Sequence, residues 1–109
     1  MAESLGAFEQ AVMLAIIRLG DDAYGRAVLR DVSTRLKKNV AAGAVHATLG
    51  RLERKRLIDS RLEQGTAVRG GRAKRFYRLR PDGVCALNDA REAAVALWRG
   101  IEWPLHGFA

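Results

Sequence analysis

The sequence contains little of the chemistry that cross-links or anchors a protein. Its single cysteine, Cys85, excludes a disulfide within the chain and leaves no cysteine set for a metal site. The longest apolar run, Ala11 to Ile17, is far shorter than the roughly 20 residues that a helix needs to span a bilayer. Acidic Glu3 and Glu9 lie where a secretory signal carries basic residues. We therefore expect a chain without cofactors that stays in the reducing cytoplasm.

Groups suited to catalysis are equally scarce. The only histidines, His46 and His106, have no partner at metal-ligand spacing and no serine or cysteine arranged as a nucleophile. The glycines at both ends of Gly65 to Gly70 are spaced as in a phosphate-binding loop. However, Gly71 and Arg72 follow where such a loop has Lys and then Ser or Thr. We therefore predict that the chain is not an enzyme and binds no metal.

The charge of the chain is concentrated in one segment. At 109 residues there is room for one compact unit with a modest core, and an apolar content of 49% argues for a folded protein. Residues 50–80 contain eleven Lys and Arg against three Asp and Glu, whereas the segments on either side are close to neutral. The net charge of +7 should therefore lie on one basic surface, for which nucleic acid is the leading partner.

Three amphipathic segments in the first half predict three helices. Apolar residues recur at intervals of three and four over 8–19, 23–36 and 42–55, with Asp22 as the predicted N-cap of the second segment. The inward residues of the third segment are Val45, Leu49 and Leu52. Its other face contains small and basic residues, namely His46, Ala47, Gly50, Arg51 and Arg54. Such a face allows close approach to a phosphate-lined groove, and an ordinary solvated helix face is the alternative.

The second half predicts a β-hairpin and a long helix. Two alternating segments, 57–64 and 73–79, flank a glycine-containing loop and indicate the hairpin. Its basic residues, as expected of a wing that contacts a DNA backbone, are Arg69, Arg72, Lys74, Arg75 and Arg78. Pro81 suits the first turn of a helix that runs to about Ile101. The apolar stripe of this helix comprises Val84, Leu87, Ala90, Ala94, Leu97 and Ile101. We expect the stripe to form a dimer, and packing on the first helix of the same chain is the alternative.

Three motifs, found in order, resemble those of the PadR family of transcriptional regulators. They are Phe8 to Ile16 with Leu19-Gly20 and Ala23-Tyr24-Gly25, then Gly43 to Ile58, then Gly71 to Leu79. The first is similar to the opening of the family's domain, the second to its recognition helix and the third to its wing. Together they cover about residues 5–83.

Three positions depart from the family's pattern. His46 stands where the recognition helix usually has Tyr, and it keeps a hydrogen-bonding ring that can become charged near about pH 6.5. Arg56 replaces the glycine that usually follows this helix, at a cost of about 1 kcal/mol if the position is left-handed. Arg80 replaces a Thr before the last helix, so Asp82 is the expected acidic residue of its first turn.

The resemblance implies a mainly α fold with a small β-hairpin. It implies a winged helix-turn-helix DNA-binding domain over residues 1–80 and a C-terminal dimerisation helix with a short tail over 81–109, in one compact unit. The implied function is that of a homodimeric, sequence-specific transcriptional repressor on near-palindromic double-stranded operator DNA. In some members a small aromatic or drug-like molecule releases the operator. A winged helix used only for protein–protein contact is the alternative.

These motifs together yield predicted residues for each site. The predicted DNA-binding residues are Tyr24, Gly25, Gly43, His46, Ala47, Arg51, Arg54, Arg69, Arg72 and Lys74. The predicted dimer interface comprises Phe8, Leu87, Ala90, Ala94, Leu97, Trp98 and Ile101. Arg51 is the candidate for a base-edge contact, with a phosphate contact or a salt bridge to a neighbouring Glu as alternatives. For Tyr24 the alternative is a core aromatic, and Trp98, the candidate ligand-binding residue, has structural packing as its alternative.

Overall fold

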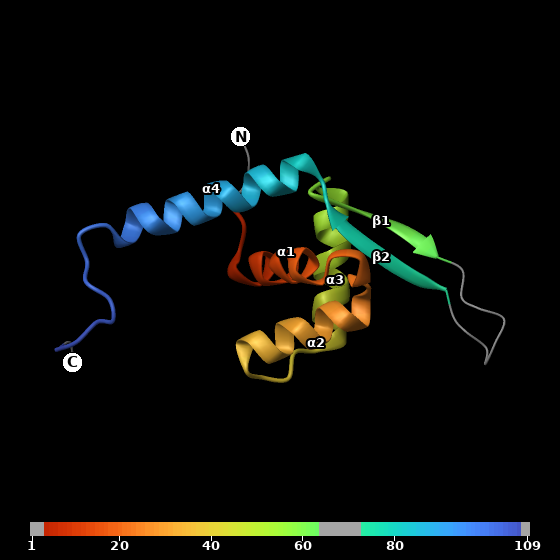
Figure 1. Cartoon of the computed structure of the whole chain (residues 1–109), viewed down its shortest axis with the longest axis horizontal. Coiled ribbons are helices and arrows are strands. Elements are labelled where there is room, and N and C mark those ends of the chain that lie inside the picture. The colour runs from red at the N-terminus through yellow and green to blue at the C-terminus, as the bar shows by residue number, and fades with distance from the viewer. Residues whose placement is uncertain (1–3, 64–72, 108–109) are drawn as a thin grey trace.

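The computed structural model describes residues 4–63 and 73–107 of the chain. Its elements, in order, are α1 (Ala7–Leu19), a 3-10 turn (Gly20–Asp22), α2 (Gly25–Leu36), α3 (Ala42–Arg54), β1 (Ile58–Glu63), β2 (Lys74–Leu79) and α4 (Pro81–Trp98). Helices α1, α2 and α3 form a body from which the hairpin and α4 extend in opposite directions (Figure 1). The predicted mainly helical fold with one hairpin is confirmed.

One hydrophobic core joins the three helices of the body to the hairpin. Val45, Leu49 and Leu52 all point inward, as predicted, and each is at most 2% exposed. Other members of the core are Val12, Met13, Ala15, Ile16, Ala23, Val28, Val32, Ile58 and Tyr77. Each large aliphatic side chain buried in this way contributes about 1.5–3 kcal/mol relative to exposure. The helical periodicity of the sequence is therefore the main determinant of the body.

A short extended segment before α2 attaches the hairpin to the body. The Tyr77 amide donates a hydrogen bond of 2.8 Å to the Ala23 carbonyl, and Tyr24 forms an antiparallel bridge with Phe76. Strand β2 therefore lies between this segment and β1. The prediction that Asp22 caps α2 is wrong, because the extended backbone needed for this pairing delays the helix to Gly25.

The two faces of the hairpin have different surroundings. Its register pairs Ile58 with Leu79 at the base and Glu63 with Lys74 at the far end. Side chains of directly paired residues lie on the same face of the sheet, and alternate residues lie on opposite faces. Ile58 and Tyr77 therefore face the core, where both are buried, while Phe76 lies on the outer face.

The exit from α3 has the left-handed geometry that usually favours glycine. Arg56 adopts a φ of 60°, so the cost of about 1 kcal/mol applies. The Arg56 amide donates to the Glu53 carbonyl, and the Leu57 amide donates to the Leu52 carbonyl. These two bonds form a Schellman motif, which satisfies carbonyls at the end of the helix and turns the chain into β1.

Helix α4 begins against the body and then leaves it. A Cβ added at Gly83 would lie 2.1 Å from the Leu57 carbonyl oxygen, so only glycine allows this close approach. Asp82 lies in the first turn and the Arg80 side chain makes no capping hydrogen bond, as expected. The helix ends at Trp98 instead of the predicted Ile101, because the backbone becomes extended at Arg99.

None of the helices in the described part of the chain has the length and apolar character needed to cross a membrane.

Candidate nucleic-acid interface

The outward face of α3 has small residues at its start and a basic residue at its end. The residues opposite the buried side of the helix are Gly43, Ala47, Gly50 and Arg54. A Cβ at Gly43 would meet nothing within 4 Å, and one at Gly50 would lie 3.4 Å from the Arg54 guanidinium. The helix backbone is therefore open to close approach along this face, with Arg54 lying beside it. His46 is exposed on one flank.

Arg51 lies on the other flank of α3, where it contacts α1. Its Nε lies 3.3 Å from a carboxylate oxygen of Glu9, and one of its terminal nitrogens donates to the Thr48 hydroxyl at 3.2 Å. Lys55 donates to the same Glu9 oxygen at 3.1 Å. Of the alternatives predicted for Arg51, the structure thus shows a salt bridge to a glutamate. Arg51 therefore links α3 to α1, and its predicted contact with a base edge stays a prediction.

Glu9 is the acceptor that joins these two helices. It is 7% exposed, and its second oxygen accepts a hydrogen bond of 3.0 Å from the Gly6 amide at the start of α1. Burial alone would raise the pKa of Glu9, but the bonds from Gly6, Lys55 and Arg51 outweigh burial and hold the pKa below its ordinary value. Glu9 is therefore a buried carboxylate that stays ionised.

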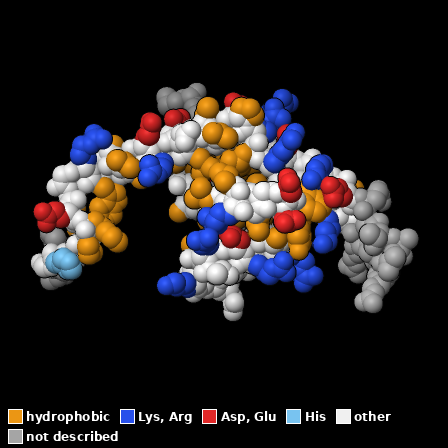
Figure 2. Space-filling view, viewed as in Figure 1, with side chains coloured by type: hydrophobic (Ala, Val, Ile, Leu, Met, Phe, Trp, Pro, Cys, Tyr) orange, Lys and Arg blue, Asp and Glu red, His pale blue; other side chains and the backbone are white. Residues whose placement is uncertain are grey.

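Part of the positive charge in the described part of the hairpin and just after it is paired within the chain. Arg61 pairs with Glu63 at 2.7 Å, Arg78 with Asp59 at 3.2 Å, and Arg80 with the other Asp59 oxygen at 3.5 Å. Lys and Arg side chains nevertheless gather over the hairpin and along α2 (Figure 2). The charge count of the sequence therefore overstates the charge that this surface offers to a ligand.

Tyr24 lies between the first turn of α2 and the hairpin. Its ring packs edge-on against Phe76, with 5.7 Å between ring centroids, and the Lys74 ammonium lies 4.2 Å from the centroid of the Tyr24 ring. Its hydroxyl accepts a hydrogen bond of 3.1 Å from Arg30. The structure thus brings together two predicted residues, Tyr24 and Lys74, with Gly25 next in the chain. The predicted wing residues Arg69 and Arg72 lie outside the described residues.

Sequence reasoning missed Arg30 and Glu9 as parts of this surface. Tyr24 lies outside α2 and Arg30 lies inside it, so no helical spacing relates them. Glu9 meets Arg51 of α3 and Lys55, the residue that follows α3, more than forty residues later in the chain. A buried acid among apolar helix positions is the one signal of a distant basic partner that the sequence contains.

The predicted dimer residues divide into two groups along α4. Leu87 and Phe8 of α1 are half-buried and pack against the core of their own chain, and their place in a dimer interface stays a prediction. Farther along, every residue from 91 to 100 is exposed, with Leu97 at 79% and Trp98 at 44%. A groove between the N-terminal segment and α4 is lined by Leu5, Gln10, Ala90, Ala94 and Leu97. Hydrophobic side chains also mark the far end of α4 and the following tail (Figure 2).

A body of three helices, a hairpin attached to it by residues 23 and 24, and a projecting last helix together define a winged-helix architecture. Comparison of the sequence with protein-family models and with curated proteins finds no match. Solved structures do match. A PadR-like transcriptional regulator from Bacillus cereus superimposes with a TM-score of 0.73 at 17% identity, covering 94% of this chain and 95% of that one.

Two further solved structures support the same fold. A PadR family transcriptional regulator from Eggerthella lenta has a TM-score of 0.65 at 24% identity, covering 83% of this chain and 76% of the other. RosR of H. salinarum has a TM-score of 0.66 at 22% identity, covering 94% and 84%. The chain therefore has the winged-helix fold of the PadR-like regulators, and the resemblance read from the motifs is confirmed at the level of the fold.

Replacement of Glu9 by Gln tests the link between α1 and α3. We expect the free energy of unfolding to fall by about 1 kcal/mol at about pH 7, because both cationic partners are partly exposed. The folded pKa of Glu9 is lowered, so its stabilisation is present above the unfolded pKa of about 4.3 and disappears as the pH falls through the folded value. Urea unfolding curves of wild type and variant should therefore converge once the pH lies below the folded pKa of Glu9.

Glu63→Gln is the matched control, since Glu63 and its partner Arg61 are each about half exposed. This variant should leave the unfolding free energy unchanged at every pH. If Glu9→Gln and Glu63→Gln had the same small effect at about pH 7, the proposed importance of the buried carboxylate would be contradicted.

Proposed function

We propose that this chain is a PadR-like regulator that binds double-stranded DNA and represses transcription as a homodimer. The observation that carries the proposal is the open face of α3, where small residues at Gly43, Ala47 and Gly50 precede Arg54. A helix with this face can enter a major groove, because bulky side chains would hold its backbone away from the base edges.

In this proposal the hairpin supplies contacts to the DNA backbone. Lys74 is exposed at the start of β2, where it can meet a phosphate. Arg69 and Arg72 stay predicted wing contacts. Phosphate contacts position a protein without reading sequence, so preference for an operator would come from the α3 face and His46 on its flank. We assign residues 1–80 to DNA binding and 81–109 to dimerisation.

Dimerisation through α4 is supported by the exposure of its second half. Ala94, Leu97 and Trp98 form an apolar face that no described part of the same chain covers, and Ile101 follows it. Burying such a face against a second chain removes apolar surface from water, and a two-fold axis would present two α3 helices to the DNA. The proposed operator is therefore near-palindromic.

We also predict that a ligand bound at Trp98 controls DNA binding. Trp98 is partly exposed and borders a shallow apolar depression with Ala94 and Val95. A planar aromatic or drug-like molecule could stack on the indole there and alter the dimer. A winged helix used only for protein contact is the alternative function, and the DNA-binding experiment below separates the two.

Binding of a labelled duplex tests the DNA-binding function. In fluorescence anisotropy titrations, a random duplex should bind at low salt. The association constant should fall roughly a hundredfold or more between about 50 and 200 mM NaCl, because each neutralised phosphate contributes about −0.9 to the log–log slope. Ala47→Glu should abolish binding, since it puts a carboxylate on the open face of α3.

Asn88→Glu adds the same negative charge at an exposed position of α4 and should leave binding intact. Absence of duplex binding by the folded wild-type chain at low salt would overturn the DNA-binding function and favour the protein-contact alternative.

Sedimentation equilibrium tests the dimer. The wild-type chain should sediment at twice its 12.0 kDa mass, and Leu97→Glu should shift it towards the mass of one chain. Ala96→Glu, on the opposite face of α4, is the control and should leave the mass unchanged. A wild-type chain that sediments as a monomer at micromolar concentration would contradict the proposed homodimer.

A further inference from the structure

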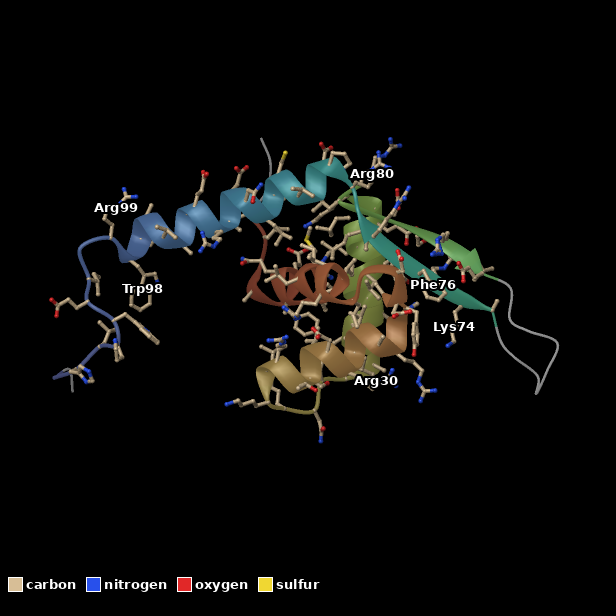
Figure 3. The ribbon with its side chains drawn as sticks, viewed as in Figure 1. Arg30, Lys74, Phe76, Arg80, Trp98 and Arg99 are labelled. Carbon is tan, nitrogen blue, oxygen red and sulfur yellow. The ribbon has the colours of Figure 1, made fainter. Side chains whose placement is uncertain are left out.

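Tyr24 holds two cationic side chains that come from different elements. The Lys74 ammonium of β2 lies over the ring, 4.2 Å from its centroid. The Arg30 guanidinium of α2 donates a hydrogen bond of 3.1 Å to the hydroxyl of the same side chain. Figure 3 shows Arg30 and Lys74 on the same side of the molecule, far from Trp98 and Arg99. One phenol therefore sets the positions of two long, otherwise flexible side chains.

The position of the Tyr24 ring is itself fixed by its surroundings. The backbone of Tyr24 pairs with that of Phe76, and the two rings meet edge to face at an interplanar angle of 64°. Arg61 covers the Phe76 ring, with its guanidinium carbon 5.0 Å from the centroid. Because strand pairing and ring packing both restrain Tyr24, the two cations that it holds are pre-arranged before any ligand binds.

Arg30 and Lys74 also lack the carboxylate partners that several other described cations have. Arg18 forms an ion pair with Asp31, and Arg61 and Arg78 form ion pairs with carboxylates of the hairpin. In the described part of the chain, by contrast, no carboxylate pairs with Arg30 or Lys74, and both side chains are exposed. Their charges are therefore available to an anionic ligand.

We propose that Arg30 and Lys74 form a two-cation clamp on the phosphodiester backbone of DNA, with Tyr24 as the positioning residue. The clamp rests on the DNA-binding function proposed above and adds Arg30 of α2 to that surface. Because one cation comes from the body and the other from the hairpin, a DNA strand that contacts both is held at two points. That arrangement fixes the hairpin relative to the DNA that α3 enters.

Loss of either cation should reduce the salt dependence of binding. With the labelled random duplex, Arg30→Gln and Lys74→Gln should each make the log–log salt slope shallower by about 0.9 per bound chain. Arg99→Gln removes the same charge at the far end of α4 and should leave the slope unchanged (Figure 3). Sedimentation of each variant verifies that its assembly matches the wild type.

Neutral substitutions of Tyr24 test its positioning role, because they leave the net charge unchanged. Tyr24→Phe keeps the ring under Lys74 but removes the acceptor for Arg30. It should weaken binding about two- to fivefold in the wild-type background and have no effect when Arg30 is already Gln. In the Lys74→Gln background it should weaken binding as much as in the wild type. Tyr24→Leu removes both supports and should weaken binding further.

Tyr24→Phe is the safeguard if Tyr24→Leu fails to fold, since Phe preserves the ring packing. If the wild type binds duplex but both Gln variants keep the wild-type slope, the clamp is overturned while the DNA-binding function stands. If Tyr24→Phe weakened duplex binding equally in the Arg30→Gln and Lys74→Gln backgrounds, the positioning role of the Tyr24 hydroxyl would be overturned. A wild type that binds no duplex would overturn the clamp together with the proposed function.

Discussion

The pairing of residues 23 and 24 with β2 is the constraint on which the basic surface depends. A two-stranded hairpin is marginally stable alone, and the hydrogen bond of 2.8 Å between the Tyr77 amide and the Ala23 carbonyl attaches it to the helical body. The same pairing delays the start of α2 to Gly25 and places the Tyr24 ring against Phe76. Without it, Lys74 and Arg30 would share no common support, and only the core packing of Ile58 and Tyr77 would hold the hairpin to the body.

The carboxylates around this surface form ion pairs with some of its cations. Glu9 engages Arg51 and Lys55 between α1 and α3, and Asp59 engages Arg78 and Arg80 at the base of the hairpin. The Glu9 pairs link α1 to α3, whereas the Asp59 pairs are exposed and contribute little to stability. The described cations of residues 50–80 therefore divide into those that form ion pairs within the chain and those that are available to a ligand, a difference that the charge count of the sequence does not show.

The sequence predicted most of the fold but less of the site. The helices of the body are predicted well because each has a periodicity that one buried face enforces, as Val45, Leu49 and Leu52 illustrate. Errors arose where a distant contact overrides local preference: strand pairing displaced the cap from Asp22. The role of Arg51 could not be read locally, since its partner lies on another helix. The PadR resemblance supplied the expected function, and the solved structures support its fold.

The central claim is that α3 and the hairpin together meet DNA. The most direct test is a titration of the isotope-labelled chain with duplex DNA at low salt, followed by amide chemical shifts. The account predicts the largest changes at Gly43, Ala47, Arg54 and Lys74, with the second half of α4 unaffected or altered only through dimerisation. Changes confined to α4, or no change anywhere at low salt, would contradict it.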